Sequence, residues 1–354
     1  MLKAVYGEDA NHTGIAASYN NIGSVYNSLD DHRQALEYYI KALAMQKAVN
    51  GEETNHPDIA TSYNNIGSKY NSLGDYRQAL KYCIKALAML KAVYGEDTNH
   101  TGIAASYNNI GFVHKSLGDY RQALEYQTKA LDMQKAVYGK DTNHTDIATS
   151  YINIGSVYSS LGEYRQALEY YTKALAMLNA VYGKDTNHTN IATSYNNIGS
   201  VYSILGEYRQ ALEYHMKSLN MRKAMFGEET KHTDIADSYN NIGSVYNYLG
   251  DYRQALEYYT KALDMRKAVY GEDTNHTDIA SSYRNIGLVY DSLGDCRQAL
   301  ECHLKTLNIV KAQHGDVITN SRIAHCYKNI AITYYSLGAY RQALDYYTKG
   351  LNML

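Results

Sequence analysis

The amino-acid sequence predicts an all-α solenoid, a chain of helix pairs stacked one on the next. Three observations favour this class: a period of 44 residues, apolar spacing typical of helices, and glycines at regular breaks. The period is clearest in a set of glycines 44 residues apart: Gly7, Gly51, Gly95, Gly139, Gly183, Gly227, Gly271 and Gly315. A fixed period of roughly 20–50 residues is the signature of a repeat protein.

The repeat that ends at Gly183 illustrates one unit. Its first predicted helix runs from about Ile147 to Leu161, with apolar or aromatic side chains every three or four residues. Gly162 then favours a stop, because glycine tolerates a positive φ. The second predicted helix runs from about Tyr164 to Tyr182. Asn190 suits the start of the next helix, since short polar side chains cap free N–H groups.

Small residues are expected where the two helices of a unit approach closely. Gly155 lies on the first helix, and Ala167 and Ala174 lie on the second. With Gly155 taken as position 8, the unit resembles the tetratricopeptide repeat at signature positions 4, 7, 8, 11, 20, 24 and 27: Tyr151, Ile154, Gly155, Tyr158, Ala167, Tyr171 and Ala174. The family's proline at position 32 is replaced here by Asn179, so we expect the second helix to run a further turn.

Within that family the chain is most similar to the kinesin light chain and nephrocystin-3-like type. The second unit follows the motif of that type at Gly51, His56, Pro57, Asp58, Ile59, Ala60, Asn64, Asn65, Ile66, Gly67, Tyr70, Gly74, Tyr76 and Ala79. Two further loop residues, such as Thr54 and Asn55, lengthen the period to 44. The resemblance implies a helix-turn-helix solenoid of eight repeats, which we expect to form a right-handed superhelix.

The expected boundaries follow the repeat. Residues 1–13 are the end of a preceding helix and its loop, and residues 14–354 are the solenoid. Its units are 14–51, 58–95, 102–139, 146–183, 190–227, 234–271, 278–315 and 322–354. Because each repeat contacts only its neighbours, we expect one continuous stack. Because the chain begins inside a repeat, we expect it to be part of a longer protein or an incomplete gene model.

Composition narrows the function. The net charge is −2 with no basic block, so neither nucleic acid nor insertion into a membrane is expected. There is no apolar run long enough to span a bilayer and no secretory signal, which favours a cytoplasmic protein. The four cysteines form no disulfide framework, and buried, reduced thiols are expected at Cys83 and Cys302. There is no phosphate-binding glycine loop and no nucleophile motif, so we expect no cofactor and no enzymatic activity.

One loop position repeats a histidine, in His12, His56, His100, His144, His188, His232 and His276. Neighbouring members are a whole repeat apart, about 20 Å or two helix diameters. A zinc ion needs its ligands at about 2.0–2.1 Å. We therefore expect structural or loop-capping roles and no metal site.

The resemblance implies a concave groove lined by repeat positions 2, 5, 9 and 12, with position 6 at its edge. Position 5 reads Asn20, Asn64, Asn108, Ile152, Asn196, Asn240, Arg284 and Lys328. Position 6 reads Asn21, Asn65, Asn109, Asn153, Asn197, Asn241, Asn285 and Asn329. Position 9 reads Ser24, Ser68, Phe112, Ser156, Ser200, Ser244, Leu288 and Ile332. These positions form the candidate site for a bound segment.

Asparagine carries both a donor and an acceptor, which suits the backbone of an extended peptide. At position 6 an amide that bonds a neighbouring helix is the open alternative, whereas at position 5 we favour a role in ligand binding. In the last two repeats Arg284 and Lys328 accompany Leu288 and Ile332, a combination suited to an acidic segment with a hydrophobic anchor. Simple drift near a chain end is the alternative explanation.

The sequence therefore predicts a non-catalytic scaffold that binds extended protein or peptide segments in its groove. A kinesin light chain-like cargo adaptor is the main alternative, and it is a special case of the first. A regulatory repeat arm of a larger enzyme is a third interpretation, less favoured. The partner and the pathway are not encoded in any motif of the sequence.

Overall fold

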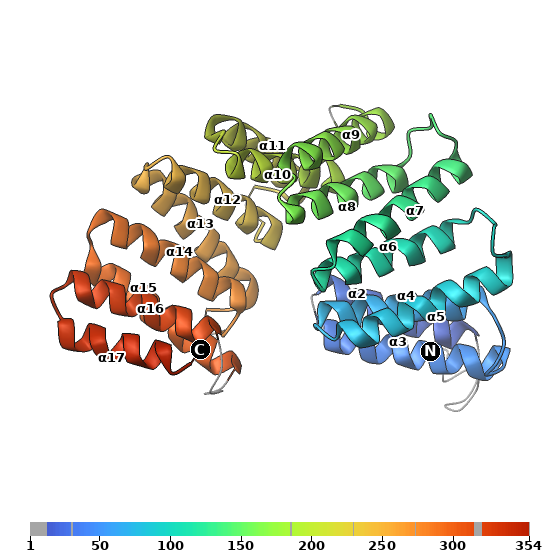
Figure 1. Cartoon of the computed structure of the whole chain (residues 1–354), viewed down its shortest axis with the longest axis horizontal. Helices are drawn as coiled ribbons and strands as arrows, with labels where there is room; N and C mark the ends of the chain where they lie inside the picture. Colours follow the sequence, from blue (N-terminus) through green and yellow to red (C-terminus); the bar gives the residue numbers. More distant parts are fainter. Residues whose placement is uncertain are drawn as a thin grey trace. The chain divides into compact units, whose positions relative to one another are not determined.

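The computed structural model describes residues 13–29, 31–184, 186–228, 230–272, 274–314 and 321–353. These residues form sixteen α-helices and no strand, which confirms the all-α class (Figure 1). The first eight are α2 (Thr13–Ser28), α3 (His32–Asn50), α4 (Pro57–Ser72), α5 (Tyr76–Tyr94), α6 (Thr101–Ser116), α7 (Tyr120–Tyr138), α8 (Thr145–Leu161) and α9 (Tyr164–Tyr182). The others are α10 (Thr189–Ile204), α11 (Tyr208–Phe226), α12 (Thr233–Tyr248), α13 (Tyr252–Tyr270), α14 (Thr277–Leu293), α15 (Cys296–His314), α16 (Ser321–Ser336) and α17 (Tyr340–Leu351).

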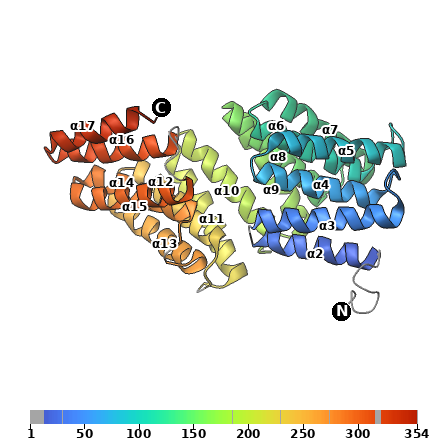
Figure 2. The same ribbon diagram turned by 90° about the horizontal axis from the view of Figure 1, so that it is seen from below.

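The chain divides into two compact bodies, residues 1–183 and 184–354, called here the N-terminal and C-terminal bodies. In each body every odd-numbered helix packs against the even-numbered helix before it, and successive pairs pack on each other (Figure 2). This is the predicted stacking of helix pairs. The superhelical hand and the boundaries of the eight units stay predictions. Gly7, His12, Gly315 and most of the leading segment 1–13 lie outside the described residues.

The helix ends agree with the sequence at their C-termini. Gly162 closes α8 in the left-handed region at φ 82°, and α9 spans Tyr164–Tyr182 before Gly183, as predicted. The further turn expected from the missing proline is therefore present. The start of the first helix is different, since α8 begins at Thr145 rather than near Ile147.

The expected cap at Asp or Asn was wrong, because the capping residue is the recurring histidine two positions earlier. His144 has an extended backbone, and its Nδ1 accepts a hydrogen bond from the Asp146 N–H at 3.1 Å. Its ring also stacks on Tyr138, with centroids 3.5 Å apart. The described members that cap in the same way are His56, His100, His144, His188, His232 and His276. The predicted loop-capping role is confirmed for them.

The close approach of paired helices is confirmed at Gly155. A Cβ placed there would lie 2.9 Å from both Cδ1 and Cε1 of Tyr171, which leaves no room for any side chain. Ala167 and Ala174 are fully buried on the facing helix. Isoleucine fills the core at one position of all eight repeats: Ile15, Ile59, Ile103, Ile147, Ile191, Ile235, Ile279 and Ile323. The same buried residue thus recurs in each helix pair.

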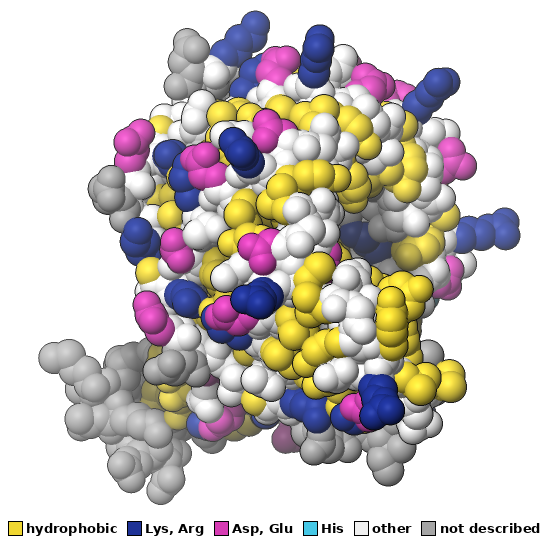
Figure 3. All heavy atoms as spheres, turned by 90° about the vertical axis from the view of Figure 1, so that its left-hand side faces the viewer, with side chains coloured by type: hydrophobic (Ala, Val, Ile, Leu, Met, Phe, Trp, Pro, Cys, Tyr) yellow, Lys and Arg dark blue, Asp and Glu magenta, His cyan; other side chains and the backbone are white. Residues whose placement is uncertain are grey.

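The surface is mixed in charge. Figure 3 shows basic and acidic side chains interspersed over one face of the molecule, with hydrophobic side chains between them. Seven of the described lysines pair with an acid four residues earlier on the same helix, as Lys173 does with Glu169 at 2.6 Å. Such exposed pairs are individually weak, about 0.3–0.5 kcal/mol. None of the described helices combines the length and the apolar character that a membrane span requires.

Candidate peptide-binding surface

The candidate surface lies on the first helix of each pair, α2 to α8 by even numbers in the N-terminal body and α10 to α16 in the C-terminal body. We call it the first-helix face; it carries repeat positions 2, 5, 6 and 9. Adjacent first helices lie next to each other in each body (Figure 1). Side chains on this face can therefore bond across from one repeat to the next.

In the N-terminal body the position-5 amides contact the following repeat. Asn64 is 9% exposed, and its Nδ2 donates to Ser106 Oγ at 2.9 Å. Asn108 and Ser150 form the same contact one repeat later, at 3.5 Å. Asn20 is half-buried, and its buried Oδ1 has no hydrogen-bond partner among the described residues. Asn64 and Asn108 therefore hold neighbouring helices together at the face where a ligand was expected, and Asn20 does not do so through that oxygen.

In the C-terminal body position 5 bonds to position 6 of the next repeat. Asn241 Nδ2 donates to Asn196 Oδ1 at 2.9 Å, and Asn285 Nδ2 donates to Asn240 Oδ1 at 2.9 Å. The structural role left open for position 6 is therefore present at Asn241 and Asn285. Asn329 is 7% exposed. The other members are half-buried, except for the exposed Asn21: Asn65, Asn109, Asn153 and Asn197.

Position 9 divides into two groups. Ser24, Ser156 and Ser244 hydrogen-bond the tyrosine hydroxyl at position 24 of their own repeat, as Ser24 does to Tyr39 at 3.2 Å. Ser68 and Ser200 are half-buried, and neither faces a tyrosine. The apolar members are exposed: Phe112 is 47%, Leu288 42% and Ile332 40% exposed.

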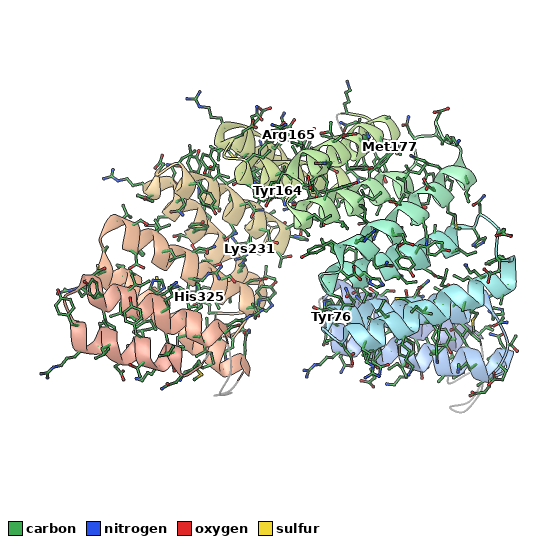
Figure 4. The ribbon with its side chains drawn as sticks, in the orientation of Figure 1. Tyr76, Tyr164, Arg165, Met177, Lys231 and His325 are labelled. Atoms are coloured by element: carbon green, nitrogen blue, oxygen red, sulfur yellow. The ribbon has the colours of Figure 1, made fainter. Side chains whose placement is uncertain are left out.

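A pocket of about 440 Å³ lies where α14, α15 and α16 meet. Its basic or histidine lining comes from Arg284, Arg322 and His325, all exposed, and none of its described lining residues carries a carboxylate. Figure 4 labels His325 on the C-terminal body. Lys328 is exposed and lies one turn after His325 on α16. The two basic position-5 residues therefore flank a pocket of positive character.

A set of buried polar side chains near the ends of the second helices was missed by the sequence reasoning. Gln46 and Gln134 accept from Ser62 and Ser150 of the next repeat, each at 2.7 Å. Arg222 and Arg266 take the same place. A comparison every 44 residues would have found these polar residues, because the same repeat position is apolar in other units: Gln46, Leu90, Gln134, Leu178, Arg222, Arg266 and Val310.

The two arginines of this set differ in their counter-ions. Arg266 is 6% exposed, and its Nη2 pairs with Asp237 Oδ1 at 2.6 Å from repeat position 2. Arg222 is 8% exposed and bonds the Asp234 carbonyl and Ser238, and it makes no ion pair with the described residues. Burial lowers the pKa of Arg222, and Asp234 and Asp237 oppose that change from a longer distance. A buried cation with incomplete compensation is destabilising.

Cysteine and metal chemistry find no support in this geometry. Burial raises the pKa of Cys83 to about 12 and that of Cys302 to about 11, which disfavours the reactive thiolate. The buried, reduced thiols predicted at Cys83 and Cys302 are confirmed, whereas Cys296 is half-buried. Within the described part of the chain, no three His, Cys, Asp or Glu side chains gather in a way that could hold a metal ion.

Comparison with known families now identifies the class. The tetratricopeptide repeat model matches residues 14–92, 58–136, 102–180, 146–224 and 234–312, and a second model of the same repeat matches 323–353. The chain therefore belongs to the tetratricopeptide repeat family. Chains of this family are typically protein-interaction scaffolds. A search of the curated proteins gave no match.

Solved structures support the fold, and one of them is a kinesin light chain-like protein. A tetratricopeptide-sensor signal transduction ATPase with numerous domains from Pyrococcus horikoshii is 16% identical with a TM-score of 0.64, covering 95% of this chain and 47% of its own. A Rap protein complexed with competence and sporulation factor is 14% identical with a TM-score of 0.60, covering 96% and 97%. A kinesin light chain-like protein of nearly identical repeats from Podosopora anserina is 17% identical with a TM-score of 0.50, covering 60% and 97%.

Proposed function

We propose that this chain is a non-catalytic interaction scaffold that binds an extended, acidic protein segment on the first-helix face of its C-terminal body. The observation that carries the proposal is the positive pocket between α14, α15 and α16. Arg284 and His325 line it, Lys328 lies one turn further along α16, and none of the described lining residues carries a carboxylate. An acidic side chain of a partner would complete it, because opposite charges brought together in a partly dehydrated pocket attract more strongly than in water.

A hydrophobic anchor on the same segment is supported by position 9. Leu288 is one turn from Arg284 on α14, and Ile332 is one turn from Lys328 on α16. Residues four apart lie on the same side of a helix, so each basic residue is paired with an exposed aliphatic one. An acidic segment with one apolar side chain matches both features.

The asparagines at repeat positions 5 and 6, called here the asparagine ladder, have a smaller part in this proposal than the sequence suggested. The amides of Asn196 and Asn240 each bond a neighbouring repeat, yet each amide can make further hydrogen bonds. Only the donor and acceptor sites that the contacts between repeats do not use are available to a peptide backbone. Binding specificity is accordingly assigned to the basic and aliphatic side chains, and the ladder mainly holds the face in shape.

A cargo adaptor of the kinesin light chain type is the second candidate. The motif at Gly51 to Ala79 favours it, and so does the likeness to a kinesin light chain-like fold. The Rap fold, solved with competence and sporulation factor, supports partner binding by such a stack without specifying the partner. A regulatory arm of a larger enzyme rests only on the likeness to the sensor-containing ATPase.

The test is a charge reversal with a matched control. Arg284→Glu with Lys328→Glu should weaken partner capture from lysate and its salt dependence, because exposed charges are screened over about 8 Å at physiological ionic strength. Arg297→Glu with Arg341→Glu makes the same change of charge at exposed positions on α15 and α17 and should leave capture unchanged. Asn196→Ala with Asn240→Ala should weaken capture without altering its salt dependence.

Capture is measured by mass spectrometry of pull-downs, with folding checked by circular dichroism. Partners lost from the Arg284 and Lys328 variant are then retested as synthetic acidic segments, each with and without its apolar residue. Unchanged recovery from both first-helix variants, with folding intact, would exclude the first-helix face and direct attention to the second helices.

A further inference from the structure

A second pocket, of about 420 Å³, lies between α10 and α12, where the repeats depart from their own pattern. His215 lines it, at a repeat position that is tyrosine in four repeats and a smaller or different side chain in the others: Tyr39, Tyr171, Tyr259 and Tyr347 against Cys83, Gln127, His215 and His303. Ile204 and Tyr248 also line it, and they replace the serine found at Ser28, Ser72, Ser116, Ser160, Ser292 and Ser336. Two replacements at an otherwise constant serine position and one at a variable tyrosine position thus meet at one place in the C-terminal body.

At the first of these positions His215 replaces the phenol ring that tyrosine supplies in other repeats. In the fourth repeat the Tyr171 ring lies against Gly155, and its hydroxyl bonds Ser156. The His215 ring lies against Gly199 in the same way, at 3.0 Å from a Cβ placed there. Imidazole is shorter than a phenol, so it does not extend to position 9. Ser200 lines the pocket and instead donates to the Asn196 carbonyl at 3.0 Å.

The polar groups of the pocket suit a hydroxyl. Asn196 Oδ1 accepts from Asn241 Nδ2, so His215 Nδ1, 3.1 Å away, donates to the same oxygen. That assignment leaves Nε2 as the acceptor of the imidazole ring. Burial lowers the pKa of His215 to about 4, which keeps the ring neutral at neutral pH. Ser200 and Ser244 add hydroxyl groups that both donate and accept.

The other two departures build an apolar rim. Tyr248 stacks on Tyr208 with ring centroids 5.7 Å apart and planes 9° from parallel. Tyr248 is nevertheless 61% exposed, and Ile204 is 55% exposed. A serine at either position would remove this wall. Aromatic rings attract one another beyond the area they bury, so the rim favours an aromatic guest.

We propose that this pocket is a binding site for a phenol group, with the ring against Ile204 and Tyr248 and the hydroxyl toward His215, Ser200 and Ser244. The pocket volume lies within the range of about 300–1,000 Å³ usual for small-molecule sites. A free phenolic compound and a tyrosine side chain of a partner both carry this group. The site is separate from the positive pocket and does not depend on the function proposed above.

The test measures dissociation constants by ligand-observed nuclear magnetic resonance, with p-cresol as the probe and toluene as its analogue without the hydroxyl. Saturable binding of p-cresol to the wild-type chain is expected. Toluene should bind about 2- to 10-fold more weakly, the range that one net hydrogen bond provides. His215→Tyr should weaken p-cresol binding more than 10-fold, because it supplies the missing phenol from within the chain.

His215→Tyr restores a residue that this repeat position already carries, so the fold should tolerate it. Ile204→Ser with Tyr248→Ser is the second variant and restores the repeat's own serines; it should also weaken binding. Cys83→Tyr makes a comparable change at the same repeat position in the N-terminal body, beside Gly67 and Ser68, and should have no effect. N-acetyltyrosinamide identifies the source: tighter binding than p-cresol supports a partner's tyrosine, and weaker binding supports a free phenolic compound.

Three results would overturn the inference: no saturable p-cresol binding, toluene binding as tight as p-cresol binding, or undiminished binding by folded His215→Tyr. The Arg284 and Lys328 variant should bind p-cresol like the wild type. Failure of that variant to lose partners therefore bears on the proposed scaffold function alone.

Discussion

Gly155→Leu is the sharpest test of the helix-pair packing, because the structure leaves no space at this position. A Cβ on Gly155 would be 2.9 Å from two ring carbons of Tyr171 and 3.3 Å from the Ala167 carbonyl oxygen. Real Cβ atoms do not approach other atoms at 2.9 Å, so the Tyr171 ring or the helix must move. The ring is 4% exposed and has little free volume around it. Leucine adds three further carbons to the same contact.

Two opposing effects set the magnitude. Overpacking a well-packed core costs about 1–3 kcal/mol. Replacing glycine within a helix returns about 0.8–1.0 kcal/mol of helix propensity. The expected net loss of stability is therefore roughly 0–2 kcal/mol, and the upper end is expected because leucine adds three carbons where even a Cβ does not fit. The chain offers a comparison of its own: the eighth repeat has Ala331 at this position, and its paired Tyr347 is 42% exposed.

The assay is urea unfolding followed by circular dichroism, with Gly155→Leu, Tyr171→Ala and the double variant measured together. If the clash is with the Tyr171 ring, the double variant should be less destabilised than the sum of the singles, with a coupling of about 0.5–3 kcal/mol. A wild-type midpoint for Gly155→Leu would refute the helix-pair register. Strict additivity would show that some other neighbour bears the strain.

Two further predictions concern buried groups of the C-terminal body. Thr193→Asp copies the acid that pairs with Arg266 and should raise the urea midpoint by giving Arg222 a counter-ion; an unchanged or lower midpoint contradicts the assigned role of that acid. The pKa of His215 is about 4 in the folded chain and 6.5 in the unfolded chain. As the pH falls, the unfolded chain therefore binds the proton first. Stability should therefore fall as the pH drops from 6.5 toward 4, by as much as about 3 kcal/mol, and His215→Tyr should remove that part of the pH dependence.

The sequence was sufficient for the backbone, because every repeat states the same pattern. Gly155 predicted the close helix contact, and Gly162 and Gly183 predicted the helix ends. The start of the first helix was misplaced because the loop contains several residues that can cap. His144 caps through ring Nδ1 and also stacks on Tyr138, a combination that depends on three-dimensional placement.

The exposure of the candidate residues was partly predictable from the sequence, and their role in binding stays a proposal. Arg284 and Lys328 are exposed on the first-helix face as the sequence suggested. The asparagine positions were harder, because an amide looks the same in sequence whether it faces a ligand or a neighbouring repeat. Asn241 and Asn285 are bonded to the preceding repeat, and only the distance between first helices decides this.

Departures from the repeat are where individual function can arise, and the structure separates two kinds. Lys69 replaces a buried valine of the pattern, and its Nζ is held by Asn27 Oδ1 of the preceding repeat. Asp291 is likewise bonded, to His303 at 2.8 Å and to Thr333 of the next repeat at 2.9 Å. Such polar departures have hydrogen-bond partners in neighbouring helices and so link one repeat to the next.

His215, Ile204 and Tyr248 are departures of the other kind. His215 leaves the space that a tyrosine fills in other repeats, and Ile204 and Tyr248 form the apolar side of that space. The result is a pocket rather than a new internal contact. Arg284 likewise lines a pocket whose described residues carry no carboxylate. The other repeats fold with serine or another residue at these positions, so the fold itself does not require the changes. Binding of another molecule at these two pockets is therefore our proposal for what the changes do.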